Sequence, residues 1–191
     1  MNHNILEIEN LNVHFPIHIG TVHAVEDVTL NLKKGEVMGL VGESGCGKST
    51  LLNILGLLDN PSGGSYVFHE TEVANLKEKG RTNLRKGNIG FVFQSFHLVP
   101  YLTLLENVML PLATVKMSSK KKRALAEDAL LRVGLNGKSH RLPGQTSGGE
   151  QERVAIARAI VNEPPLLFAD EPSGNLDTKT TREVMDLLKN L

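Results

Sequence analysis

Residues 42–49 have the types and spacing of a loop that binds a phosphate group. Their sequence, GESGCGKS, fits the pattern G-x-x-x-x-G-K-[ST] and lies between an apolar run and a segment with helical spacing. The glycines of such a loop let successive backbone N–H groups point at an anion, and the helix adds the positive end of its dipole. We therefore predict a nucleotide-binding loop formed by Gly42, Glu43, Ser44, Gly45, Cys46, Gly47, Lys48, Ser49 and Thr50.

Lys48 and Ser49 of this loop have predicted roles in binding the nucleotide, and Cys46 has two possible interpretations. The Lys48 ammonium would reach the β- and γ-phosphates, and the Ser49 hydroxyl would bind Mg²⁺, which prefers hard oxygen ligands. The alternative is a flexible glycine turn that happens to precede a lysine. For Cys46, a small side chain tolerated in a tight loop is one interpretation, and a thiol activated by the helix N-terminus is the other.

Two adjacent carboxylates, Asp170 and Glu171, follow an apolar run at residues 166–169. Ligands of open α/β sheets bind at the carboxyl ends of the strands, which is where this pair would lie. Asp170 would hold Mg²⁺ through its water shell, and Glu171 could take a proton from the water that attacks the γ-phosphate. The alternative is a pair of acids that simply ends a strand.

Hydrophobic periodicity predicts that strands and helices position these groups. Residues 5–15 and 25–32 roughly alternate apolar and polar side chains, which is typical of half-buried antiparallel strands. Residues 37–41 are almost all apolar, a pattern that predicts a parallel strand covered on both faces before the glycine-rich loop. Residues 51–58 have helical spacing, so strand, loop and helix form the first unit.

The rest of the chain predicts a helical lobe inserted between two βα halves. The lobe would consist of an apolar loop and a helix, ended by a glycine. The expected elements are a strand at residues 89–93, a loop at 96–111, helices at 119–133 and 150–161, a strand at 166–169, and a last helix with Val184, Leu187, Leu188 and Leu191 on one stripe.

Composition limits the class of protein. The 191 residues have room for one domain, or for one core with a smaller lobe, and 40% hydrophobic with 22% charged residues is typical of a folded chain. The 21 basic and 21 acidic residues balance, so the total charge does not indicate a nucleic-acid partner. One cysteine cannot form an internal disulfide, and the sequence shows no spanning-length apolar run and no secretory signal. We expect a cytoplasmic protein.

A third motif gives a resemblance to a known family. Residues 147–153, SGGEQER, are followed by VAIARAI and then by the strand that ends in the two acids. In this order and spacing the motifs resemble those of ABC transporter ATPases, over nearly the whole chain. Serine and glycines that open a helix present a hydroxyl and backbone donors to an anion. The resemblance implies that this anion is the γ-phosphate of ATP held by a second subunit, bound by Ser147, Gly148, Gly149 and Glu150.

The same resemblance implies further site residues. Gln94 corresponds to the glutamine that senses Mg²⁺ and joins the core to the helical lobe, and residues 174–177 correspond to a loop that crosses the dimer interface. Phe15 occupies the place of an aromatic ring stacked on adenine, with packing within the strand as the alternative. The implied catalytic residues are Glu171, Lys48 and Gln94, and the implied Mg²⁺ ligands are Ser49, Gln94 and Asp170.

The implied fold class is α/β, a P-loop NTPase with a RecA-like, mostly parallel sheet, an antiparallel β subdomain and an inserted α-helical subdomain. Residues 1–191 would form one ABC ATPase domain, with 1–93 and 150–191 as the nucleotide-binding core and 94–149 as the helical subdomain. The sequence departs from the family at Thr146, where leucine is usual, and at Glu150, where glutamine is common. It also lacks the switch histidine beyond Glu171, so we expect a chain without the C-terminal part of the usual domain, or a regulatory module with weak hydrolysis.

Two segments resemble different branches of the family. Residues 93–100 and 106–108 resemble the lipoprotein-release and macrolide-efflux branch, whereas residues 14–50 look more like oligopeptide-importer ATPases. The first branch implies a substrate that is exported or extracted from the membrane, such as a lipoprotein, lipid, peptide or drug, and a peptide importer is the alternative. The implied partners are a second copy or a second ABC ATPase, and transmembrane permease subunits that hold the chain at the inner face of the cell membrane.

One rival function belongs to another class, a soluble ABC protein that acts on DNA or ribosomes. Such members carry long coiled-coil insertions or two cassettes, and this sequence shows neither. Residues 116–123 contain five basic side chains. We predict that they form the solvated start of a helix, with contact to lipid head groups as the alternative.

Overall fold

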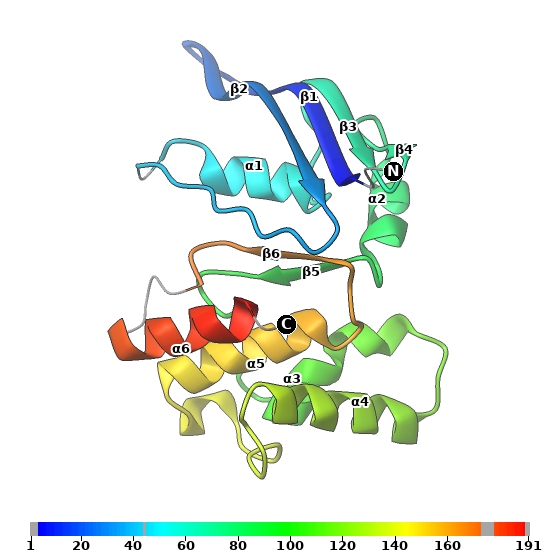
Figure 1. Cartoon of the computed structure of the whole chain (residues 1–191), viewed down its shortest axis with the longest axis vertical. Coiled ribbons are helices and arrows are strands. Elements are labelled where there is room, and N and C mark those ends of the chain that lie inside the picture. Colours follow the sequence, from blue (N-terminus) through cyan, green and yellow to red (C-terminus); the bar gives the residue numbers. More distant parts are fainter. Residues whose placement is uncertain (1–3, 44, 173–177, 190–191) are drawn as a thin grey trace. The chain divides into compact units, whose positions relative to one another are not determined.

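The computed structural model describes residues 4–43, 45–172 and 178–189. The chain divides into two compact units, residues 1–85 and 86–191 (Figure 1). The division into a nucleotide-binding core of residues 1–93 and 150–191 and a helical subdomain of residues 94–149 stays a prediction. Within the described ranges, no helix is long and apolar enough to cross a membrane.

Unit 1 is built on an antiparallel sheet with the strand order β2-β1-β3-β4. Strands β1 (Asn4–Ile17) and β2 (Gly20–Lys33) pair antiparallel, which confirms the two predicted antiparallel strands, although β2 begins five residues before the predicted range of 25–32. Strands β3 (Gly63–Phe68) and β4 (Thr71–Glu72) were not predicted. A Cβ at position 64 would lie 2.4 Å from the carbonyl oxygen of Asn10, so β3 can approach β1 this closely only with glycine there.

Two helices accompany this sheet. Helix α1 (Lys48–Leu55) follows the glycine-rich loop as predicted and lies along one face of the sheet (Figure 1). It buries four aliphatic side chains, and the Tyr66 hydroxyl of β3 donates to the Leu55 carbonyl oxygen at 2.6 Å, which ties helix and sheet together. Helix α2 (Glu78–Arg85) is mainly polar and was not predicted.

The prediction of a buried parallel strand at residues 37–41 is wrong. These residues form no strand, and their side chains are exposed, with Val37 at 79% and Val41 at 99%. A parallel strand needs the backbone of a neighbouring strand at its edge, and among the described residues no strand pairs with this run. Apolar character alone therefore did not determine its conformation.

Unit 2 contains a two-stranded parallel sheet of β5 (Ile89–Val92) and β6 (Leu166–Ala169), paired from Ile89↔Leu166 to Val92↔Ala169. Both strands confirm the predictions. Its helical elements, in chain order, are α3 (Leu104–Met109), η1 (Leu110–Thr114), α4 (Ser119–Arg132), η2 (Pro143–Gln145), α5 (Gly148–Ile160) and α6 (Thr178–Lys189).

The prediction of a loop over residues 96–111 is wrong in its second half, where α3 and η1 form. Thr103 begins α3 with a capping box, in which its side chain accepts from the Glu106 N–H and the Glu106 carboxylate accepts from the Thr103 N–H. Pro111 does not end helical structure, because it lies in the first turn of η1, where a missing N–H is tolerated.

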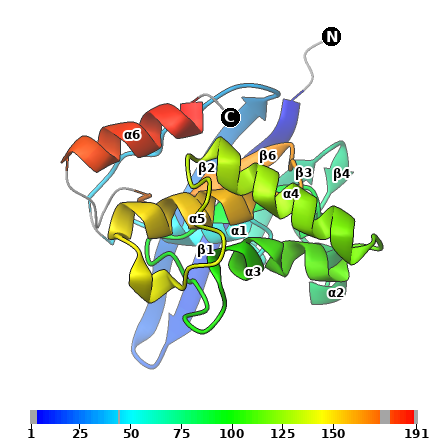
Figure 2. The same ribbon diagram turned by 90° about the horizontal axis from the view of Figure 1, so that it is seen from below.

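The core of unit 2 lies among α3, α4 and α5, which pack against one another (Figure 2). Leu104, Val108, Leu130 and Ile156 are almost completely buried there. Val184 of α6 is fully buried, as its predicted stripe requires, whereas residue 191 lies outside the described residues.

Candidate functional site

The predicted phosphate loop leads directly into α1. Gly45 (φ 80°) and Gly47 (φ 90°) both have left-handed backbone conformations, which favour glycine. A Cβ at Gly47 would lie 2.1 Å from the carbonyl oxygen of Ala24 in β2. The loop can therefore approach β2 only because position 47 has no side chain. Of the predicted loop residues, Ser44 lies outside the described ones.

Donors for an anion gather where this loop meets α1. The Lys48 Nζ donates to the carbonyl oxygens of Gly42 at 2.7 Å and Glu43 at 2.8 Å, so the ammonium lies over the loop. Ser49 is exposed in the first turn of α1, and that turn contains no acidic side chain that would oppose an anion. Cys46 is exposed, and its Sγ lies 3.7 Å from the Lys48 Nζ.

Phe15 belongs to the same unit as the phosphate loop. It lies in β1, pairs with Val22 of β2, and is 42% exposed. Val22 is two residues from Ala24, the residue beside Gly47, which is about 7 Å along a strand. The ring is therefore accessible and close in the sheet to the loop, and its stacking on adenine stays a prediction.

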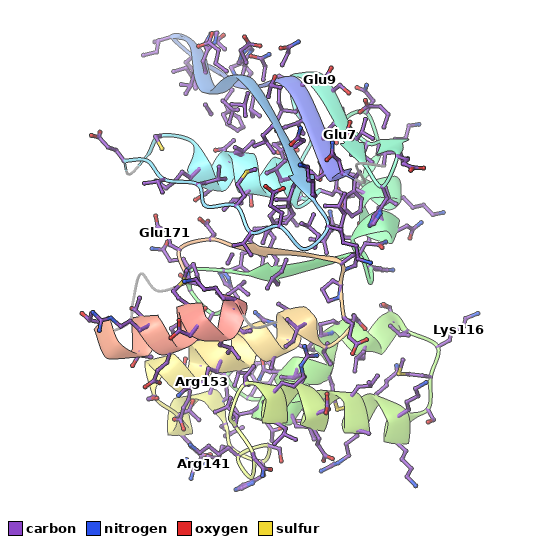
Figure 3. All side chains as sticks on the ribbon, in the orientation of Figure 1. Glu7, Glu9, Lys116, Arg141, Arg153 and Glu171 are labelled. Carbon is purple, nitrogen blue, oxygen red and sulfur yellow. The ribbon has the colours of Figure 1, made fainter. Side chains whose placement is uncertain are left out.

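Unit 2 brings together two groups that are 77 residues apart in the sequence. Because β5 and β6 are parallel, their carboxyl ends lie at the same edge, with Gln94 beyond one strand and Asp170 and Glu171 beyond the other. The Gln94 Nε2 donates to the Glu171 Oε2 at 3.0 Å. The Asp170 N–H donates to the Val92 carbonyl oxygen at 2.9 Å. Figure 3 shows Glu171 where the chain leaves β6.

The Glu171 backbone has an unusual conformation. Its φ is 45°, in the left-handed region that non-glycine residues seldom occupy, and its side chain is exposed. Such conformations persist where the surrounding structure imposes them, and they concentrate at functional sites. The carboxylate is thus accessible and is held at the strand edge by the Gln94 amide.

The oxygen donors of both units are of the kind that Mg²⁺ accepts. Ser49 in unit 1 offers a hydroxyl, and Asp170 and Gln94 in unit 2 offer a carboxylate and an amide oxygen. Within the part of the chain that the structure describes, no three His, Cys, Asp or Glu side chains form a cluster that could hold a metal ion. The assignment of these side chains as Mg²⁺ ligands stays a prediction.

The third motif begins helix α5. The Ser147 hydroxyl accepts from the Glu150 N–H at 3.3 Å, and the Glu150 Oε2 accepts from the Ser147 N–H at 2.8 Å, which completes a capping box. Ser147 and Gly148 are exposed at the helix N-terminus. Gly149 is buried, and a Cβ there would lie 2.4 Å from the Thr180 Cγ2 of α6. The motif therefore combines an exposed polar cap with a glycine that lets α6 approach.

Lys138 is a contact of the third motif that the sequence did not predict. Its Nζ lies 2.5 Å from the Glu150 Oε1, and this contact, with the Ser147 N–H, lowers the pKa of Glu150 to about 2. Nothing in the sequence indicates a pair between residues twelve positions apart in a loop and a helix.

At Thr146, where the family usually has leucine, the Oγ1 donates to the Pro143 carbonyl oxygen at 2.7 Å.

The motifs and the fold together define the class of protein. The profile of the family described as "ABC transporter" matches residues 25–174. The chain belongs to this family and is an ABC transporter ATP-binding domain, an ATPase. The predicted P-loop NTPase fold with an antiparallel β subdomain is confirmed by the solved structures that it matches.

Individual relatives support this assignment. The chain is 44% identical over 186 residues to the macrolide export ATP-binding/permease protein MacB of Chromobacterium violaceum. The alignment covers 97% of this chain but only 29% of the length of that protein. It is 42% identical over 184 residues to the lipoprotein-releasing system ATP-binding protein LolD of Hyphomonas neptunium, covering 96% of this chain and 81% of that one.

A solved structure is similarly close. The dimeric ATP-binding cassette MJ0796, in a post-hydrolysis state bound to ADP and Pi, matches with a TM-score of 0.89 at 41% identity. The match covers 97% of this chain and 82% of that one.

Proposed function

We propose that the chain powers a transporter that exports its substrate or extracts it from the membrane, as in the lipoprotein-release and macrolide-efflux branch. The observation that carries the proposal of hydrolysis is the contact between Gln94 and Glu171 at the carboxyl edge of β5 and β6. The similarity to MacB and LolD supports the direction of transport. Within this function, the substrate is a lipoprotein, lipid, peptide or drug.

Each site residue has a chemical role in this proposal. The loop amides and the Lys48 ammonium bind the phosphates. Ser49, Gln94 and Asp170 would hold Mg²⁺, which would supply positive charge against the phosphate oxygens. The Glu171 carboxylate accepts a proton from the attacking water, and the Gln94 amide orients that carboxylate through its hydrogen bond to Oε2. The Phe15 ring stacks on adenine.

Dimerisation and membrane partners complete the proposed function. The exposed Ser147 and Gly148 at the α5 N-terminus bind the γ-phosphate of ATP held by a second copy or by a second ABC ATPase, in a two-fold pair. The dimeric state of MJ0796 supports this arrangement. Transmembrane permease subunits then hold the pair at the inner face of the cell membrane, and closure and separation of the pair drive them.

Two substitutions test the site. Lys48→Ala should abolish Mg-ATP binding in calorimetry, and the control Lys34→Ala, an exposed lysine of the same unit, should bind normally. Glu171→Gln should keep ATP binding, lower the hydrolysis rate by about 10²- to 10⁴-fold, and accumulate an ATP-bound dimer in light scattering. The exposed control Glu127→Gln should hydrolyse like the wild type.

Each outcome bears on a different part of the proposal. Normal ATP affinity of Lys48→Ala would remove the assignment of the phosphate loop, and unchanged turnover of Glu171→Gln would remove the assigned base. Co-purification with the membrane subunits encoded beside its gene tests the direction of transport. Permeases of the importer type would contradict the proposed export.

A further inference from the structure

Arg158 joins the far end of helix α5 to the loop that carries Gln94. Its Nη1 donates to the His97 carbonyl oxygen and its Nη2 to the Phe96 carbonyl oxygen, both at 2.6 Å. The planar guanidinium thus binds two consecutive carbonyl groups that are 62 and 61 residues away in the sequence. Below, residues 93–103, between β5 and α3, are called the Gln94 loop.

The two residues that Arg158 holds have strained backbones. Phe96 has a φ of 51° and His97 a φ of 47°, a region that bulky side chains rarely occupy without external support. The Phe96 N–H donates to the Phe93 carbonyl oxygen at 3.2 Å, and the rings of Phe93 and His97 meet edge to face at 5.1 Å. Since this tight turn encloses Gln94, any force that fixes Phe96 and His97 also fixes the backbone on either side of Gln94.

The Arg158 guanidinium binds backbone carbonyl groups rather than a carboxylate. Among the described residues, no ion pair of Arg158 with a carboxylate is found, and burial lowers the pKa of the guanidinium. A planar fork with several fixed donors suits two adjacent carbonyl groups, which a lysine ammonium cannot bind in the same way. The guanidinium therefore holds the backbone at Phe96 and His97 in place.

A second side chain holds the other half of the Gln94 loop. Asn107 of α3 is fully buried, and its Nδ2 donates to the carbonyl oxygens of Val99, Leu102 and Thr103 while its Oδ1 accepts from the Val99 N–H. The later part of the loop is thus attached to α3. The earlier part, next to Gln94, is attached to α5.

Helix α5 also carries the Ser147 cap at its opposite end, about 16 Å from Arg158 along the helix axis. Its middle residues, Val154 and Ile156, are fully buried in the core of unit 2, so the helix is firmly packed into that core. We propose that Arg158 is a positioning residue, which makes the Gln94 loop follow the movement of the helix whose N-terminus binds the partner's ATP. This inference rests on the proposed functions of Gln94 and of the Ser147 cap.

The first test measures the loop without nucleotide. Arg158→Lys keeps the charge and the aliphatic stem but loses the forked contact, and Arg158→Met removes the charge as well. In amide hydrogen exchange, the peptide that covers residues 93–98 should exchange about tenfold faster in both variants, because a hydrogen bond to a charged group is lost. Peptides of α4 should be unchanged, which excludes global unfolding. The exposed control Arg123→Lys should leave every peptide unchanged. Unchanged exchange at residues 93–98 would overturn the inference.

The second test measures coupling to hydrolysis in a double-mutant cycle of Arg158→Lys and Gln94→Ala. If Arg158 acts through Gln94, Arg158→Lys lowers kcat in the wild-type background and has no further effect in the Gln94→Ala background. An equal loss of kcat in both backgrounds would overturn the proposed coupling. If Gln94→Ala alone leaves kcat unchanged, the proposed role of Gln94 fails, and the exchange experiment still decides whether Arg158 holds the loop.

Discussion

Glu152 is a carboxyl group buried in the core of unit 2. It lies on α5, is 1% exposed, and neither carboxylate oxygen has a hydrogen-bond partner among the described residues. Burial disfavours the charged form and raises the pKa of Glu152 from 4.5 to about 7. The stability of the fold should therefore depend on pH through this one side chain.

The direction and size of that dependence follow from the two pKa values. Between pH 4.5 and about 7, Glu152 is ionised in the unfolded chain but still protonated in the folded one, so the folded state binds more protons. The free energy of unfolding therefore falls as the pH rises through this window, and the loss is complete above about pH 7. At about 1.4 kcal/mol per pKa unit, the loss is about 3 kcal/mol.

The substitution Glu152→Gln isolates this effect, because glutamine has the same shape and cannot ionise. We expect the free energy of unfolding of the variant, minus that of the wild type, to increase by about 3 kcal/mol between pH 4.5 and pH 8. The corresponding increase in the difference between the two melting temperatures is about 6–12 °C.

Urea unfolding at a series of pH values measures this difference. Every other titrating group contributes equally to both proteins and cancels. The pKa values of Glu78 and Glu150 are lowered to about 2, so these groups titrate below the window. The control Glu127→Gln, at an exposed glutamate of α4, should give a curve parallel to that of the wild type. A parallel curve for Glu152→Gln as well would refute the reasoning.

Two further predictions concern the phosphate loop and the third motif. Gly47→Ala should abolish Mg-ATP binding in calorimetry, since its Cβ would lie 2.1 Å from the Ala24 carbonyl oxygen. The control Gly35→Ala has a similar φ and open space around the new Cβ, so it should bind Mg-ATP normally. Equal Mg-ATP affinities of the two variants would contradict this prediction. Lys138→Met should raise the pKa of Glu150 from about 2 toward its usual range, which an NMR titration of the carboxyl group would detect. An unchanged pKa would show that the capping box alone keeps the pKa of Glu150 low. The stability that Glu150 contributes is present above pH 4.5 and is lost as the pH falls toward its folded-state pKa, so in this variant the loss should be smaller and should be complete at a higher pH.

Elements with strong local signals were predictable from the sequence. Helix α4 begins after Ser118, whose hydroxyl accepts from the Lys121 N–H, and Gly134 follows its end with a φ of 73°. Local chemistry fixes both boundaries, so the predicted range of 119–133 is within one residue of the structure. The strands β5 and β6 are equally clear as short apolar runs.

Elements whose formation depends on distant neighbours were not predictable. The apolar run 37–41 predicted a strand, but a strand also needs a partner backbone, which the run does not have among the described residues. Strand β3 carries few apolar residues in its first half, and it forms because Gly64 allows close contact with Asn10 of β1. Helix α3 lies within residues 96–111, for which a loop was predicted, and its capping box determined the outcome.

Short stretches of sequence are enough to identify the chemical groups of the site: a loop of amides with an ammonium and a hydroxyl, a pair of acids after a strand, and a serine with glycines before a helix. These signals lie in consecutive residues, where backbone geometry and spacing suffice to predict the chemistry. Which distant groups meet depends on the three-dimensional fold. The amide of Gln94 bonds to Glu171, and the guanidinium of Arg158 bonds to the turn after Gln94, because strand register and helix packing, rather than local spacing, set these contacts.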